Sequence, residues 1–152
     1  MNAVTPADEL SGLEQLRAVF DADHPERGPG IGKTLGFTVV ELEEGRVVFG
    51  GHPDERVYNP IGTVHGGYAA SLLDSCVGCA VHTLLPPGKA YTTLELKVNF
   101  VKGLSDRVPL VRAIGHVIHS GSRVATADGR LVGPDGTLYA HATTTCLIFD
   151  PR

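Results

Sequence analysis

The residues best suited to catalysis lie in the stretch 59–74, where a Gly-rich segment leads into a long apolar run. Asp74 is the only acid between Gly66 and Leu85, and no cation lies one helical turn away from it. A carboxylate among apolar side chains costs on the order of several kcal/mol unless it is paired or solvated. We therefore expect Asp74 to be kept for chemistry, because a carboxylate can activate water or attack a carbonyl carbon.

Gly66 and Gly67 can supply the donor that stabilises a developing oxyanion. A helix N-terminus offers unpaired N–H groups and the positive end of the helix dipole, and a residue without a side chain lets a substrate carbonyl approach the backbone. Asp74 follows Gly66 by eight residues, which is about 12 Å along a helix. A reacting carbonyl must lie about 3 Å from both groups. We therefore expect Gly66 of one chain to meet Asp74 of another at a subunit interface.

The chain before this stretch predicts one helix and one hairpin. Ser11 and Glu14 have the spacing of a capping box, and apolar residues recur at helical spacing up to Phe20, which predicts a helix over residues 11–20. The segment from Asp21 to Gly32 is rich in Pro, Gly and Asp and predicts a loop. The expected hairpin pairs strands 37–43 and 46–50 around Glu44-Gly45, and an irregular connection follows over residues 51–60.

A central helix is predicted over residues 66–85. Its apolar residues recur nearly all round, so it should be wrapped by other structure, and Pro86-Pro87-Gly88 ends it. The strand predicted over residues 91–101 alternates, with Leu94, Leu96, Val98 and Phe100 on one face. Further strands are expected over 108–119, 122–131 and 137–149, with turns at Ser120-Gly121 and Gly133–Gly136. The expected class is α+β, an antiparallel meander that curls around one helix and has an edge able to pair across a dimer.

Composition limits the classes of function. The 152 residues are 42% apolar and 20% charged, which fits one soluble domain, residues 1–152. The net charge of −4 gives no reason to expect nucleic acid or an anionic membrane surface as a partner. The N-terminus has no apolar signal-peptide core, and three cysteines favour a reducing cytoplasm. The apolar run 64–85 contains Asp74 and two histidines, so we expect a buried helix and no membrane span.

Two other patterns have mainly structural interpretations. Cys76 and Cys79 have the spacing of a redox dithiol, but such a pair normally opens a helix at an exposed end, and here core packing is expected. His116 and His119 have an odd spacing on a strand, and no acid or cysteine completes a ligand set, so no metal site is expected.

The stretch 59–74, the Pro-Pro-Gly stop and the strand 92–100 resemble a hotdog-fold acyl-CoA thioesterase of the PaaI and 4-hydroxybenzoyl-CoA thioesterase group, which carries His-Gly-Gly. The resemblance covers residues 33–149. It implies a long helix wrapped by a curved antiparallel sheet, and assembly as a homodimer or homotetramer. It implies that Asp74 is the nucleophile or general base and that Gly66 N–H polarises the thioester carbonyl. It places His65 and Asn59 nearby as orienting groups, and Thr92 or Thr93 as a hydroxyl that positions water. Some members carry a Thr where this chain has Gly78.

The substrate implied by the resemblance is an aromatic or medium-chain acyl-CoA, with no cofactor beyond the coenzyme A that belongs to the substrate. Gly67 would lie against the thioester. The turn Ser120-Gly121-Ser122-Arg123 could present N–H groups and a guanidinium to the phosphates. Other basic candidates for the phosphates are Lys89, Lys102, Arg107 and Arg112.

Several alternatives fit the same sequence. An acyl-thioester hydratase or dehydratase and a non-catalytic acyl-CoA-binding module are the rival functions. Direct water attack and a covalent intermediate are both compatible with a single acid. The competing structural interpretations are a satisfied core acid for Asp74, a turn or capping role for His65, a packing role for Gly66-Gly67 and a turn role for Asn59.

Overall fold

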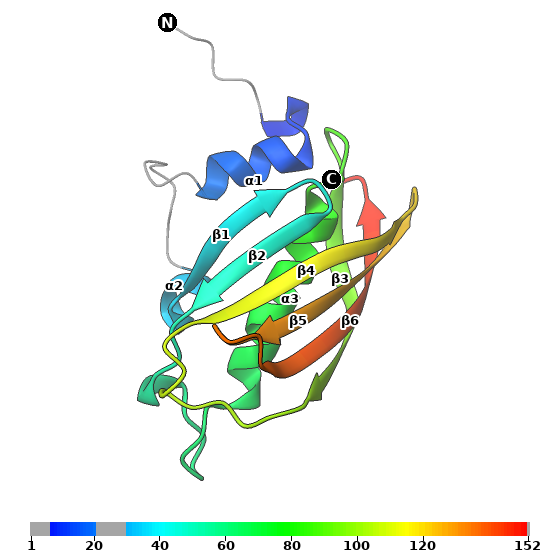
Figure 1. Ribbon diagram of the computed structural model, residues 1–152. Helices are drawn as coiled ribbons and strands as arrows, with labels where there is room; N and C mark the ends of the chain where they lie inside the picture. Colours follow the sequence, from blue (N-terminus) through cyan, green and yellow to red (C-terminus); the bar gives the residue numbers. More distant parts are fainter. Residues whose placement is uncertain (1–6, 21–29, 152) are drawn as a thin grey trace, which may run out of the picture.

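One long helix lies against the concave face of a six-stranded antiparallel sheet in the computed structural model, which describes residues 7–20 and 30–151 (Figure 1). The helix is α3, Gly66–His82, and it packs mainly on strands β2, β4 and β5. Leu72, Leu73 and Val77 are completely buried between helix and sheet. The predicted α+β architecture, a central helix wrapped by a curved sheet, is confirmed.

The strands follow the spatial order β1-β2-β4-β5-β6-β3. Their bounds are β1 Phe37–Glu43, β2 Arg46–Gly51, β3 Ala90–Phe100, β4 Val111–Ser120, β5 Val124–Val132 and β6 Leu138–Phe149. The hairpin and the final three strands are sequential neighbours, as predicted. The expected simple meander is wrong for β3, which pairs with β6 at the far edge of the sheet. The chain reaches this edge strand through α3 and returns to β4 through the connection over residues 101–110.

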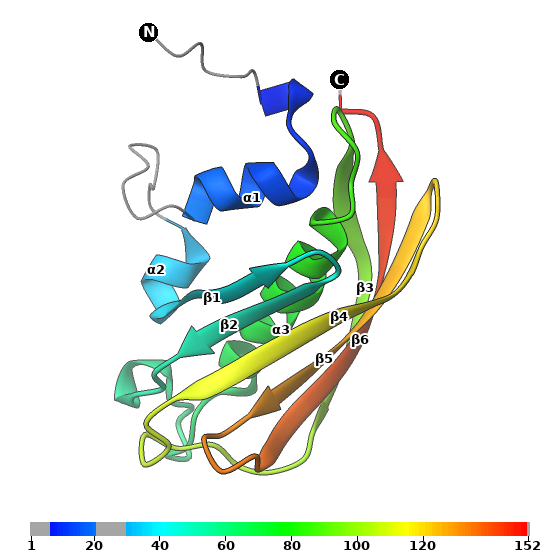
Figure 2. The same cartoon turned by 45° about the horizontal axis from the view of Figure 1, so that its top comes forward.

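The N-terminal helix is confirmed as α1, Gly12–Phe20, after a short 3₁₀ turn at Ala7–Glu9. The Glu14 carboxylate accepts hydrogen bonds from Ser11 N at 2.8 Å and Ser11 Oγ at 2.6 Å, which is the predicted capping box. Gly12 N donates to Leu85 O at 2.9 Å, so α1 starts against the C-terminal end of α3 (Figure 2). A side chain at Gly12 would overlap the His82 carbonyl, so this close approach requires glycine.

The loop predicted from Asp21 to Gly32 is wrong at its end, where Ile31–Leu35 forms the short helix α2. Gly36 ends α2 in the left-handed conformation, with φ of 74° and its N–H on Gly32 O. Five residues are too few to show helical periodicity in sequence. Residues 21–29 of the predicted loop lie outside the described residues.

Element boundaries differ from the predictions by a few residues. The central helix ends at His82, and residues 83–85 continue as a tighter turn in which Leu84 N donates to Val81 O and Leu85 N donates to His82 O. The strand expected from residue 108 begins at Val111, and the strand expected from residue 122 begins at Val124. A 3₁₀ turn, Glu55–Val57, lies in the connection predicted to be irregular.

Strand β3 does not keep the predicted alternation. A register shift against β6 lies between Thr93 and Glu95, which is a β-bulge. Leu94, predicted to share a face with Leu96, is 59% exposed, whereas Leu96 packs against the core. The bulge therefore turns Thr93 toward α3, because the extra residue reverses which of the alternating side chains point to each face of the sheet.

The contact between α1 and α3 predicts a pH dependence of stability. His82 Nε2 lies 3.1 Å from Gln15 Oε1, and burial lowers the pKa of His82 below its usual 6.5. The unfolded chain then binds more protons than the folded chain in the window between 6.5 and the lower folded pKa. The free energy of unfolding should therefore fall as the pH drops through this window. Urea unfolding at pH 7.5 and pH 5 should show a smaller loss in His82→Gln than in the parent, and an equal loss in both would contradict the assignment.

Candidate active site

Asp74 lies on the side of α3 that faces away from the sheet, and its side chain is exposed. The sheet covers only part of α3, although its apolar residues recur nearly all round, since Gly67 is also exposed and Ser71 and Ser75 are half-buried. Water therefore solvates the carboxylate in a single chain, and the desolvation cost expected from the sequence does not arise there. Asp74 is thus an acid on the side of α3 that the sheet does not cover.

The Thr93 hydroxyl donates to Asp74 Oδ1 at 3.2 Å. This contact exists because the β3 bulge turns Thr93 toward α3. Thr92 is exposed on the other face of the strand, so only one of the two candidate threonines lies beside the acid. Asp74 Oδ2 has no partner among the described residues, which leaves it open to water or to a substrate.

His65 is the N-cap of α3. Its Nδ1 accepts a hydrogen bond from Gly67 N at 2.8 Å, and its carbonyl accepts from Tyr68 N at 3.0 Å. The ring proton therefore lies on Nε2. Gly67 N–H is occupied by this cap, so it is not available to the substrate. The expectation that Gly67 could supply the oxyanion donor therefore does not fit this geometry. A Cβ at Gly67 would lie 2.9 Å from His65 Nδ1, so the cap also requires glycine there.

Gly66 provides the free donor at the start of α3. Within the described part of the chain its N–H has no acceptor, whereas the N–H groups of Gly67 and Tyr68 are both used by His65. The Phe100 ring lies beside Gly66, and a Cβ at Gly66 would approach Phe100 Cζ to 3.0 Å. A free N–H at the positive end of a 17-residue helix, with no side chain of its own, has the properties required of an oxyanion donor.

Asn59 builds the turn that leads into His65. Its Oδ1 accepts from Ile61 N and Thr63 N, each at 3.1 Å, and its Nδ2 donates to Thr63 Oγ1 at 2.8 Å. The side-chain amide is thus used within the turn, and no hydrogen bond joins it to His65 within the described chain. The geometry gives Asn59 a turn-forming role and an indirect influence on the helix start.

The two halves of the candidate site open into different cavities. A cavity of about 350 Å³ is lined by His65, Gly66 and Phe100 among others. A second cavity of about 780 Å³ includes Asp74. Neither cavity includes both Gly66 and Asp74, which agrees with the ~12 Å separation expected along the helix.

Tyr91 is a site neighbour that the sequence reasoning missed. Its ring packs on Gly78, one turn after Asp74, where a Cβ would lie 2.5 Å from the Tyr91 hydroxyl. Burial raises the pKa of this hydroxyl, so Tyr91 stays neutral beside the carboxylate. The bulge at Thr93 explains the omission, because simple alternation along β3 does not show which residues face α3.

The turn Ser120-Gly121-Ser122-Arg123 is not close to the helix start of the same chain. It forms the tip of the β4–β5 hairpin, at the end of the sheet away from Gly66 (Figures 1 and 2). Its backbone is held by Gly121 N donating to Val124 O and by Arg123 O accepting from Ile148 N. The predicted contact of this turn with coenzyme A stays a prediction.

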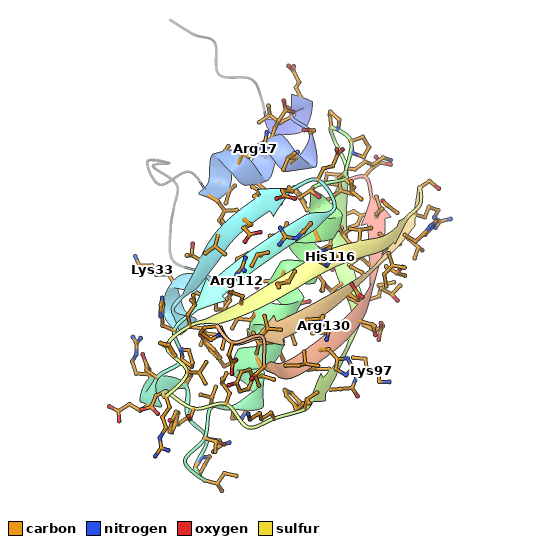
Figure 3. All side chains as sticks on the ribbon, in the orientation of Figure 1. Arg17, Lys33, Lys97, Arg112, His116 and Arg130 are labelled. Carbon is orange, nitrogen blue, oxygen red and sulfur yellow. The ribbon has the colours of Figure 1, made fainter. Side chains whose placement is uncertain are left out.

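The other basic candidates differ in position. Lys102 lines the cavity beside Gly66, with Nζ 5.9 Å from the centre of the Tyr139 ring. Lys89 is paired with Asp150 at 2.6 Å. Arg112 is paired with Glu41 on the outer face of the sheet, the side away from α3 (Figure 3). Of these three, only Lys102 lines the cavity that also contains Gly66.

The cysteines have the environment of core residues. Burial raises the pKa of Cys76 above its usual range and the pKa of Cys79 to about 12, so both thiols stay protonated at neutral pH. Among the described residues, no three His, Cys, Asp or Glu side chains come together in a way that could hold a metal ion. Across the same residues, every helix is too short or too polar to span a bilayer.

Known proteins share this fold and sequence pattern. The family described as the Thioesterase superfamily matches residues 61–140, more than half of the chain. The 1,4-dihydroxy-2-naphthoyl-CoA hydrolase of Listeria monocytogenes is 28% identical over 92 residues, which are 60% of this chain and 73% of that protein.

Two solved structures share the fold at low sequence identity. A thioesterase from Haemophilus influenzae superposes with a TM-score of 0.76 at 20% identity, over 91% of this chain and 90% of its own. The PaaI protein from the phenylacetic acid degradation operon of Escherichia coli superposes with a TM-score of 0.71 at 19% identity, over 81% of this chain and 86% of its own. The protein therefore belongs to the thioesterase superfamily, has the hotdog fold and is a thioester hydrolase.

Proposed function

We propose that the protein hydrolyses an aromatic or medium-chain acyl-CoA to the free acid and coenzyme A. The observation that carries this proposal is the position of Asp74, whose carboxylate is held by Thr93 and lines a large cavity. The Listeria relative is named as the hydrolase of an aromatic acyl-CoA, which supports an aromatic acyl group here.

Asp74 and Gly66 have complementary tasks in this reaction. Attack on the carbonyl carbon moves an electron pair onto the carbonyl oxygen, and Gly66 N–H donates to that oxyanion. Collapse of the intermediate breaks the carbon–sulfur bond and releases the thiolate. If water attacks, Asp74 takes its proton and returns it to the leaving sulfur. If Asp74 attacks, water then hydrolyses the anhydride. Thr93 holds Oδ1 in either route and leaves Oδ2 to act.

The site is shared between two chains in this proposal. Gly66 and Asp74 of one chain open into separate cavities. Strand β3 is an edge strand, and Leu94, Phe100 and Val101 at this edge are between 56% and 60% exposed. An apolar edge strand favours pairing with a second copy, and two-fold pairing would set two α3 helices antiparallel. We infer a homodimer, or a homotetramer built from it, in the cytoplasm.

Asp74→Asn should lower kcat for acyl-CoA hydrolysis by at least about a hundredfold, because the amide cannot accept a proton or attack as a carboxylate does. Thiol release from a panel of aromatic and aliphatic acyl-CoAs measures this directly. Asp128→Asn, an exposed acid on the outer sheet face, is the matched control and should keep full activity. Full turnover by Asp74→Asn would refute the mechanism. Substrate loss without thiol release would indicate a dehydratase, and binding without turnover a binding module.

Subunit complementation tests the shared site. Gly66→Pro removes the N–H at the first helical position, where proline is well tolerated, and Gly66→Ala adds a Cβ but keeps the donor. Gly66→Pro and Asp74→Asn should each be inactive as homodimers. Refolded together, they should regain about one quarter of parental activity, because half of the dimers are mixed and each mixed dimer has one intact site. Mixed dimers can be identified by their mass. If they show no recovered activity, Gly66 and Asp74 act within one chain and the shared site is refuted.

Two substitutions at His65 separate capping from chemistry. His65→Asn keeps an N-cap acceptor for Gly67 N–H, whereas His65→Ala loses it at a cost of about 1 kcal/mol of stability. If His65 acts through the cap, His65→Asn should retain most of the activity and the melting temperature, and His65→Ala should lower both. Equal loss of activity in the two variants, with stability intact in His65→Asn, would assign the imidazole a direct chemical role.

A further inference from the structure

The cavity that contains Asp74 is closed on one side by the N-terminal part of the chain. Val19 and Phe20 at the end of α1 and residues 30–33 at the start of α2 form this side. Residues of β1, β2, α3 and β3 complete the cavity of about 780 Å³. This is within the range of small-molecule sites, about 300–1,000 Å³. No motif or spacing in the sequence indicates that residues before the first strand lie near the acid.

Aromatic contacts hold this N-terminal side in place. The Phe20 ring packs edge-on against Phe49 of β2, with centroids 5.7 Å apart and planes at 81°. Phe37 packs on the same ring from β1 at 5.8 Å. Edge-to-face pairs of this kind add about 0.5–1.5 kcal/mol each beyond the area they bury. The end of α1 is therefore fixed to the sheet, and the cavity wall is a built part of the fold.

Apolar side chains on this wall face the cavity and are not covered by other residues. Ile31 is 58% exposed and Val19 is 52% exposed, although both line the cavity. A ligand that covered such surface would gain about 25 cal/mol for each Å² removed from water. Along α3 the cavity extends from Asp74 to Cys79, about 7.5 Å of helix. This is longer than one benzene ring, and the Phe and Tyr rings in the lining favour an aromatic ligand by edge-to-face contact.

We propose that α1 and α2 form the wall that selects the acyl group, with Ile31 as a residue that determines specificity for bulky aryl acyl thioesters. The proposal rests on the proposed function, since the acyl group enters this cavity only if the thioester carbonyl lies at Asp74. Short acyl groups would end near Asp74 and would not reach Ile31, whereas a two-ring aryl group would cover it.

Paired isoleucine variants test the wall. Ile31→Ala removes wall surface, and Ile31→Trp fills the cavity. Ile118→Ala is the matched control, because Ile118 is 63% exposed on β4 and does not line the cavity. The ratio of kcat/KM for 2-naphthoyl-CoA to that for acetyl-CoA should fall about fivefold in Ile31→Ala, on the scale of a lost apolar contact, and at least about tenfold in Ile31→Trp. Ile118→Ala should leave it unchanged. A ratio within about twofold of the parent in both Ile31 variants would overturn the proposal.

A non-hydrolysable probe separates this proposal from the catalytic one. S-(2-naphthylmethyl)-CoA is a thioether, so its Kd by calorimetry does not depend on turnover. Absence of hydrolysis of every thioester would refute the proposed function alone. The wall then still requires that the thioether bind the parent and Ile118→Ala equally and bind Ile31→Ala several-fold more weakly. Equal Kd values for the parent, Ile118→Ala and Ile31→Ala, or no binding to the parent, would refute the proposal that this wall selects the acyl group.

Discussion

The rotation of α3 against the sheet is the constraint on which the rest of the structure depends. Gly115 on β4 lies so close to the helix that a Cβ there would overlap the Cys76 carbonyl, and a Cβ at Gly129 on β5 would lie 2.8 Å from Val77 Cγ1. These contacts press Cys76 and Val77 onto the sheet. Asp74 precedes Cys76 by two residues, about 200° around the helix, so it must face away from the sheet. Close backbone packing on one side of α3 therefore displays the acid on the other.

The start of α3 shows how local hydrogen bonds select one donor from several. A helix leaves its first N–H groups unpaired. The turn built by Asn59 brings the chain to His65, and His65 then satisfies the N–H groups of Gly67 and Tyr68. Gly66 N–H is left over. Capping at this helix therefore stabilises the fold and also isolates the donor best suited to an oxyanion.

The bulge in β3 links the sheet to the candidate chemistry. Without it, Thr93 would share the outward face with Lys97, and Leu94 would face the helix. With it, Thr93 reaches Asp74, Tyr91 covers Gly78, and Leu94 becomes apolar surface at the edge of the sheet. One extra residue in an edge strand thus affects both the environment of the acid and the surface available to a second chain.

Elements with local signals could be predicted from the amino-acid sequence. The capping box at Ser11 predicted α1, and the long apolar run that begins with His-Gly-Gly predicted α3 and the candidate site at its start. Turn residues predicted where the strands end. Each of these signals depends on residues close together in the chain. The short helix α2 and the edge position of β3 lacked such a signal. Three features of the candidate site could not be predicted in this way: Asp74 is exposed, Thr93 and not Thr92 contacts it, and Phe20 and Ile31 line its cavity. These depend on the rotation of α3, the register of β3 and the docking of α1, which are set by packing between residues far apart in sequence.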